Sequence, residues 1–149
     1  MANLRRYLRK DRIQVRLKSR KKADAIRELG GLLESSPEIT DYRRFLSKLF
    51  QQEAEMSSGV AEGIALPHYR NGTVLEPVIA LGTSSEGIDW GEDQPVHLVV
   101  LIGWPERHAE TYLKTVSEIS RRLRSGQVRA KLLEADEPDQ VIEALTEEP

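Results

Sequence analysis

A nearly unbroken run of apolar residues at positions 96–102 constrains the fold more than any other part of the chain. Its sequence is VHLVVLI. A strand with one face in water alternates apolar and polar residues, whereas a strand covered on both faces is apolar almost throughout. Residues 96–102 are therefore predicted to form a central strand that lies between two packed layers.

Helical and strand patterns surround this run in the sequence. Apolar residues recur at helical spacing over 23–33, 42–50, 109–123, 128–133 and from Pro138 onward, with a short helical lead-in over 4–8. Period-two alternation over 13–18 and an apolar run over 77–81 predict two more strands. Strands separated by helices predict an α/β fold, here a single-domain sandwich with a central sheet flanked by α-helices.

Local signals give further expectations. Ser19 and Thr40 are predicted to cap the first two long helices, Pro105 to open the third, and residues 84–87 to form a loop with Ile88 and Trp90 packed beneath it. The buried stripe of the second long helix is expected to comprise Tyr42, Phe45, Leu46, Leu49 and Phe50. The stripe of the third is expected to comprise Ala109, Tyr112, Leu113, Val116, Ile119 and Leu123.

Composition narrows the class of protein. The chain has 149 residues, enough for one domain, and a net charge of -2 with no cysteine, which excludes a disulfide framework or a thiolate metal site. No apolar run approaches the ~20 residues of a membrane span, and the N-terminus lacks the apolar core of a signal peptide, so no membrane insertion and a cytoplasmic location are expected. The first 22 residues are strongly basic and the last 16 acidic. Because Tyr7 is the only aromatic side chain in the basic segment, we expect a solvated face rather than nucleic-acid binding.

The stretch from Ser57 to Arg70 carries the chemistry. It has the sequence SSGVAEGIALPHYR. Hydroxyls and glycine begin it, as in a loop whose backbone amides face an anion. An apolar strand then ends at Pro67, which cannot donate to a sheet, and His68 and Arg70 follow. A rigidly held imidazole beside hydroxyl, amide and guanidinium donors is suited to handling a phosphoryl group.

This stretch resembles the signature of the enzyme IIA domains of the fructose/mannitol class of the bacterial phosphotransferase system, which include the nitrogen-regulatory type. The resemblance extends over nearly the whole chain and implies one enzyme IIA-like (type 2) domain over residues 1–149, with a mixed β-sheet. It also implies that His68 accepts a phosphoryl group from an HPr-like phosphocarrier protein. The group would then pass to enzyme IIB, or the phosphorylation state would signal to a regulated protein.

The resemblance also implies roles for neighbouring residues. The residues expected to bind the phosphoryl group are Ser57, Ser58, Gly59, Arg70 and Tyr112, where Tyr112 stands at the place of a second histidine that many members carry; a purely core role for Tyr112 is the alternative. Glu53 matches a supporting acidic residue of the family. Gln52 replaces an arginine that often precedes it, which removes one expected phosphate partner.

The remaining histidines are assigned other environments. His97 is expected to be a hydrogen-bonded residue of the sheet, and His108 to lie one helical turn before Tyr112. The three histidines are far apart and none falls in a short metal-ligand motif, so neither a metal nor another cofactor is expected. No Walker-type loop is present, which argues against direct use of ATP.

Two functions follow. The favoured one is a phosphoryl carrier, and on this view the chain is a phosphotransferase component with a transient phosphohistidine. The alternative is a regulatory module that docks to other proteins with weak or no phosphoryl transfer. Gln52 and Tyr112 favour the second. The residues that favour the first are His68, Ser58, Gly59 and Glu53.

Overall fold

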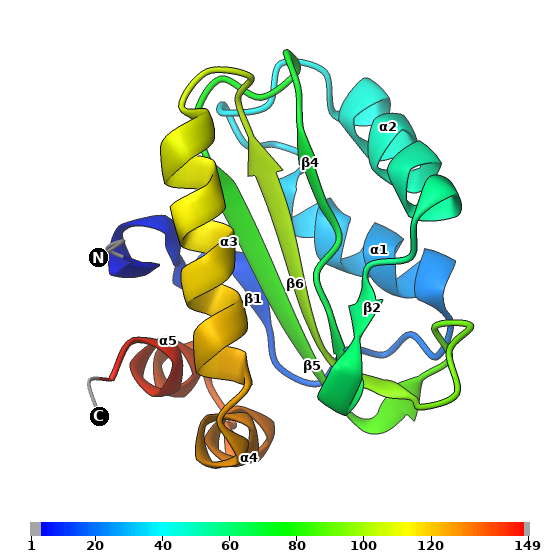
Figure 1. The fold of residues 1–149 in the computed structure, drawn as a ribbon, viewed down its shortest axis with the longest axis vertical. Helices are drawn as coiled ribbons and strands as arrows, with labels where there is room; N and C mark the ends of the chain where they lie inside the picture. Colours follow the sequence, from blue (N-terminus) through cyan, green and yellow to red (C-terminus); the bar gives the residue numbers. More distant parts are fainter. Residues whose placement is uncertain (1–3, 148–149) are drawn as a thin grey trace.

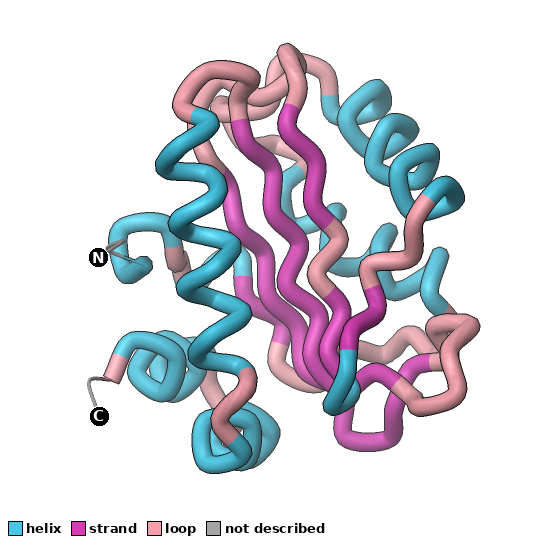
Figure 2. The backbone as a smooth tube through the Cα atoms, viewed as in Figure 1, coloured by secondary structure: helices cyan, strands magenta, loops and turns pink. Residues whose placement is uncertain are grey.

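The computed structural model describes residues 4–147 and is organised around strand β6 (Val96–Trp104). Strand β6 pairs antiparallel with β5 (Val78–Ile88) and parallel with β3 (Ile64–Ala65) and β4 (His68–Arg70). β1 (Ile13–Gln14) lies beyond β5, and β2 (Gly59–Val60) lies beyond β3. The expected mixed sheet and the central position of residues 96–102 are therefore confirmed (Figures 1 and 2).

Helices cover both faces of the sheet (Figure 1). One face packs against α1 (Lys22–Gly30) and α2 (Tyr42–Glu55), and the other against α3 (Ala109–Leu123), α4 (Gly126–Glu134) and α5 (Pro138–Thr146). Short 3-10 helices span Leu4–Tyr7, Lys10–Arg12, Gly31–Leu33 and Ala61–Gly63. No helix within residues 4–147 is long and apolar enough to cross a membrane.

Two hydrophobic cores meet across β6. Leu98, Val100 and Ile102 face the core beneath α3, α4 and α5, whereas Val99 and Leu101 face the core beneath α1 and α2. All five side chains are buried, so the absence of polar alternation in this strand has a direct cause. Burying such side chains stabilises the fold by roughly 1.5–3 kcal/mol each.

Two predicted elements differ from the structure. The first strand ends at Gln14, because Arg16 adopts a left-handed conformation with a φ of 63° and the following chain turns to bond Thr83. The predicted loop at 84–87 instead lies within β5, at an irregularity in the pairing with β6 between Thr83 and Ile88. Its hydroxyl and glycine content serves this bulge, where Gly87 has a φ of 96°. Ile88 and Trp90 are buried, as expected.

Three helix starts also differ from their predicted positions. Asp41 rather than Thr40 caps α2, because its carboxylate accepts the Arg44 N–H. Helix α1 begins after Lys21, and the Ser19 hydroxyl donates to Glu28 instead of capping. Helix α3 begins at Ala109 rather than near Pro105, because the extended chain continues through Trp104 at the end of β6.

The buried face of α3 was predicted only in part. Ile119 and Leu123 are fully buried, and Tyr112 and Val116 pack at the edge of the core. Leu113, in contrast, is 63% exposed, and the prediction that it is buried is wrong. Position 113 lies outside the row 112, 115, 116, 119 and 123 that faces the sheet, and the polar Thr115 and Glu118 are buried there.

Candidate functional site

The imidazole of His68 is held at the start of β4 by two backbone constraints. Pro67 has no N–H to donate, but its carbonyl accepts the Ile102 N–H at 2.9 Å, which fixes the chain against β6. His68 is the register partner of Ile102 and is half-buried. Its Nδ1 lies 2.5 Å from the Leu66 carbonyl oxygen. Because a carbonyl can only accept, Nδ1 carries the proton of the neutral ring and Nε2 carries the lone pair.

Leu66 also connects the histidine to the serine-glycine loop. The Leu66 N–H donates to the Ser58 carbonyl at 3.0 Å, while the Leu66 carbonyl accepts from His68. Gly59 pairs antiparallel with Ala65, which brings β2 alongside β3. The motif therefore folds back on itself, and Leu66 forms hydrogen bonds both to the Ser57–Gly59 loop and to His68.

Glu53 anchors this loop from helix α2. Its buried carboxylate accepts the Ser58 N–H at 2.8 Å and lies 2.7 Å from the Lys22 ammonium group. Burial raises the pKa of Glu53, but hydrogen bonds from the Lys22 ammonium group and the Ser58 N–H outweigh burial and leave its pKa below the ordinary value. The carboxylate is therefore ionised near neutral pH and holds the loop in place.

The Ser58 hydroxyl is a buried side-chain group of the loop without a partner among the described residues. Its Oγ is buried and has no hydrogen-bond partner within residues 4–147. Three other donors of the loop have acceptors: the Ser58 N–H bonds Glu53, the Gly59 N–H bonds the Ser57 hydroxyl at 3.2 Å, and that hydroxyl donates to Glu92 at 2.6 Å. A buried hydroxyl without a partner is costly and marks a place where a ligand atom can bind.

Tyr112 and Arg70 lie on the same side of β4 as His68. The ring centroids of His68 and Tyr112 are 6.2 Å apart, and the Arg70 guanidinium lies 5.9 Å from the Tyr112 ring centroid. Arg70 is exposed and donates to the Glu106 carbonyl at 2.5 Å. Burial raises the pKa of Tyr112, and the Arg70 charge lowers it by a smaller amount. The phenol therefore stays protonated near neutral pH and remains a hydrogen-bond donor.

Gln52, His97 and His108 have different surroundings. Gln52 is half-buried on α2, next to Glu53, and its side chain has no hydrogen-bond partner within the described residues. The His97 Nδ1 lies 2.7 Å from the Ser84 carbonyl, which confirms the predicted hydrogen-bonded histidine of the sheet. His108 is exposed, in a left-handed conformation just before α3, and accepts from Arg107.

Sequence reasoning missed two contributors to this arrangement. Lys22, which pairs with Glu53, is 31 positions earlier in the chain and looks like any other cation of the basic segment. The Leu66 carbonyl carries no sequence signal, because every residue has one. Among the described residues no group of three or more His, Asp or Glu side chains is placed to hold a metal ion.

Comparison with known proteins identifies the family. Residues 6–148 match the model of the phosphoenolpyruvate-dependent sugar phosphotransferase system EIIA 2 family, and the chain belongs to that family. It is 35% identical over 128 residues to the fructose-specific EIIA component of Haloferax volcanii, a match that covers 85% of this chain and 83% of the relative. It is 32% identical over 142 residues to the fructose-specific EIIABC component of Bacillus subtilis, covering 94% of this chain but only 22% of that longer protein.

Solved structures share the fold. The nitrogen regulatory protein IIA-Ntr of Neisseria meningitidis superposes with a TM-score of 0.89 at 23% identity, covering 96% of this chain and 99% of that one. The mannitol enzyme IIA in its complex with phosphorylated enzyme IIB from Escherichia coli superposes with a TM-score of 0.81 at 22% identity, covering 93% of this chain and 96% of that one. The expected resemblance and fold class are thus confirmed.

Proposed function

We propose that this chain is a phosphoryl carrier of a phosphotransferase system and that Nε2 of His68 is the atom that carries the phosphoryl group. The observation that supports this most strongly is the 2.5 Å contact between Nδ1 of His68 and the Leu66 carbonyl, in a chain of the EIIA 2 family. The contact keeps the proton on one ring nitrogen and leaves the lone pair on the other. A neutral imidazole is a competent nucleophile near neutral pH.

The transfer is an in-line displacement. The Nε2 lone pair attacks the phosphorus of a donor phosphohistidine, a new N–P bond forms, and the donor N–P bond breaks with its electrons returning to the donor imidazole. The His68 ring becomes electron-poor as the bond forms. The Leu66 carbonyl, already 2.5 Å from Nδ1, then accepts a stronger hydrogen bond from the same proton.

Nearby donors stabilise the phosphoryl oxygens in this proposal. The Ser58 hydroxyl is buried without a partner and supplies one hydrogen bond when the group arrives. The protonated Tyr112 phenol supplies a second, and Arg70 adds positive charge from above the Tyr112 ring. Ser57 and Gly59 act through loop geometry, since their polar groups already bond to each other and to Glu92. Glu53 holds the Ser58 backbone.

The proposed partners are other proteins of the same system. An HPr-like phosphocarrier supplies the phosphoryl group, and an enzyme IIB or a regulated protein receives it. Support for the downstream partner comes from the shared fold of the mannitol enzyme IIA that was solved in complex with phosphorylated enzyme IIB. Because partners of this kind are proposed, we also propose a cytoplasmic location for the chain.

The regulatory-module alternative rests on Gln52 and Tyr112, which stand where the family often has arginine and histidine. We disfavour this alternative because the groups that orient the His68 ring and fix its tautomer, Pro67 and the Leu66 carbonyl, are present. The discriminating experiment incubates the chain with phosphoenolpyruvate, enzyme I and a phosphocarrier, and measures intact mass. A carrier gains one phosphoryl group, which is lost in acid and kept in base, and His68→Ala abolishes the gain. Absence of any mass change with cognate donors would refute the carrier function.

A further inference from the structure

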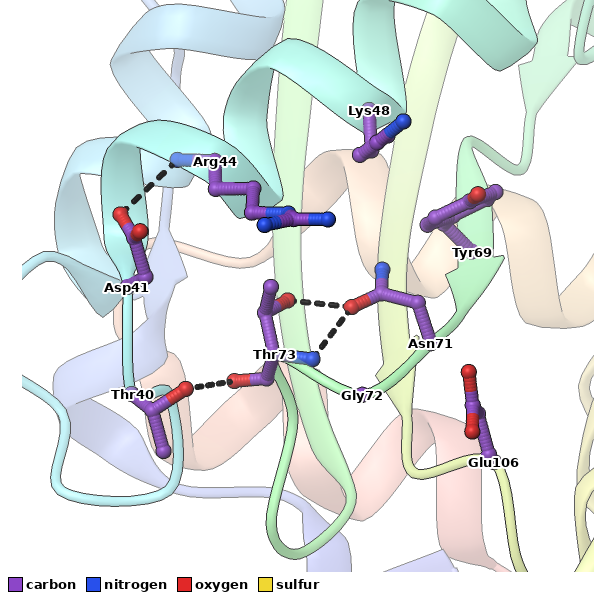
Figure 3. Close-up of a pocket in the computed structure, with 9 residues that line it drawn as sticks. All are labelled: Thr40, Asp41, Arg44, Lys48, Tyr69, Asn71, Gly72, Thr73 and Glu106. Atoms are coloured by element: carbon purple, nitrogen blue, oxygen red, sulfur yellow. Dashed lines mark hydrogen bonds between the residues drawn. The ribbon is translucent and has the colours of Figure 1, made fainter.

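A separate pocket lies on the face of the sheet that α2 covers. It has a volume of about 540 Å³ and is lined by Thr40, Asp41, Arg44, Lys48, Tyr69, Asn71, Gly72, Thr73 and Glu106 (Figure 3). Successive residues of a strand point to opposite faces. Tyr69 accordingly packs with the core on the α2 side, whereas its neighbours His68 and Arg70 contact or approach Tyr112 of α3. The pocket is therefore distinct from the phosphoryl site.

The amide of Asn71 provides an unpaired donor in this pocket. Its Oδ1 accepts the Thr73 N–H at 2.6 Å and also the Thr73 hydroxyl. A backbone N–H can only donate, so the amide oxygen must face Thr73 and the amide nitrogen must face the other way. Figure 3 shows that nitrogen directed toward the space below Lys48 and Tyr69. Asn71 is only 9% exposed, and its Nδ2 has no partner in residues 4–147.

Two cations face the same space. Arg44 and Lys48 are one turn apart on α2, and Figure 3 shows both side chains on the helix side of the pocket, across from Asn71. Neither is paired with a carboxylate within the part of the chain that the structure describes; Asp41 instead accepts the Arg44 backbone N–H as the helix cap. Like charges at this spacing repel each other, and an anion between them removes that repulsion.

The opposite wall has a different character. Glu106 contributes a carboxylate from the segment after β6, and the half-buried Tyr69 contributes an aromatic ring. A carboxylate accepts hydrogen bonds from hydroxyl groups, and an aromatic ring packs against the C–H groups of a carbon chain or ring. A ligand that satisfies both walls has an oxyanion at one end and hydroxyl groups at the other.

We propose that this pocket binds a small polyhydroxy metabolite with one oxyanion group, that is, a sugar phosphate or a sugar acid. The oxyanion lies between Arg44 and Lys48 and accepts the Asn71 Nδ2–H, and the hydroxyl groups donate to Glu106. The volume is within the range of small-molecule sites, about 300–1,000 Å³. The backbone carbonyl of Glu106 also accepts a hydrogen bond from Arg70, whose guanidinium lies over the Tyr112 ring. Glu106 therefore links the pocket to the proposed phosphoryl site.

Isothermal titration of the unphosphorylated chain tests this proposal, and it requires no phosphoryl transfer. The probes are glucose 6-phosphate, gluconate, glucose and inorganic phosphate. Saturable binding of glucose 6-phosphate or of gluconate is expected. Glucose and inorganic phosphate should bind at least about tenfold more weakly, because glucose lacks the oxyanion and inorganic phosphate lacks the polyhydroxy carbon skeleton. Which of the first two binds identifies the oxyanion. Failure of both to bind at millimolar concentration, or equal binding of glucose or inorganic phosphate, would overturn the proposal.

Matched variants locate the binding. Arg44→Gln should weaken binding about tenfold or more, whereas Arg43→Gln, an exposed neighbour outside the pocket, should leave it unchanged. Asn71→Asp keeps the acceptor for Thr73 but replaces the amide donor with a negative charge, so it should abolish binding while the fold persists by circular dichroism. If Arg44→Gln and Arg43→Gln bind the ligand equally well, the site is elsewhere and the proposal fails.

Discussion

The Nδ1 atom of His68 lies 2.5 Å from the carbonyl oxygen of Leu66, two residues earlier in the same chain. Pro67 stands between them and makes this short reach rigid. The same Leu66 bonds through its N–H to Ser58, so one residue positions both His68, the proposed nucleophile, and the Ser57–Gly59 loop. The chemistry proposed for this chain depends on that local geometry rather than on a deep cavity.

The Ser58 hydroxyl is predicted to act in transfer and not in folding. Ser58→Ala should slow phosphorylation of His68 by about tenfold or more, because a hydrogen bond made only in the transition state is lost. Its free energy of unfolding should be unchanged or slightly higher, since the buried hydroxyl has no partner to lose. Single-turnover rates and urea unfolding measure the two effects. Ser117→Ala, an exposed position on α3, is the control, and an equal slowing in both variants would contradict the role.

Glu53 should make stability depend on acidic pH. Its folded pKa is lowered from an ordinary value of 4.5, so its contribution is complete above that value and is lost as pH falls through the folded pKa. Glu53→Gln should cost about 1–3 kcal/mol near neutral pH, because Lys22 and the Ser58 N–H lose a charged acceptor. Denaturant unfolding between about pH 6 and pH 3 should show a smaller decline for the variant than for the native chain. Parallel declines would show that Glu53 is not the titrating group.

Two substitutions on α3 test the corrected helix face. Ile119→Ala should lower the free energy of unfolding by about 2–5 kcal/mol, because Ile119 is fully buried. Leu113→Ala should lower it by about 0.5 kcal/mol or less, because that side chain is 63% exposed. Urea unfolding of the two variants is the measurement. A large loss for Leu113→Ala would mean that the face of α3 is assigned incorrectly.

Gln52 is predicted to limit the rate of transfer. Gln52→Arg should speed phosphorylation by about tenfold, since a charge-assisted hydrogen bond to the phosphoryl group is worth about 1.5–3 kcal/mol. Gln51→Arg adds the same charge at the exposed neighbouring position and should have little effect. Rates are compared at equal phosphocarrier concentration and at two salt concentrations. If both variants accelerate alike, general charge attraction explains the change and a specific role for position 52 is refuted.

Much of the fold was predictable, because burial on both faces of β6 and helical periodicity are encoded in local patterns. The signals that failed have alternative physical uses: Ser84 and Gly87 form a bulge instead of a loop, and Thr40 bonds Thr73 instead of capping α2. At the site, the motif predicted that His68 and the Ser58 loop belong together, and Leu66 bonds to both. The Lys22 pair with Glu53 and the tautomer set by Leu66 were not predictable, because the first is a distant tertiary contact and the second uses a backbone group.

Nitrogen-15 NMR of the phosphorylated chain, labelled at histidine, tests most directly whether Nε2 of His68 carries the phosphoryl group. We predict that phosphorus couples to Nε2 of His68, that Nδ1 keeps its proton, and that this proton is protected from exchange by its bond to the Leu66 carbonyl. Phosphorus on Nδ1, or on His97 or His108 with His68 unmodified, would refute phosphoryl transfer to Nε2 of His68.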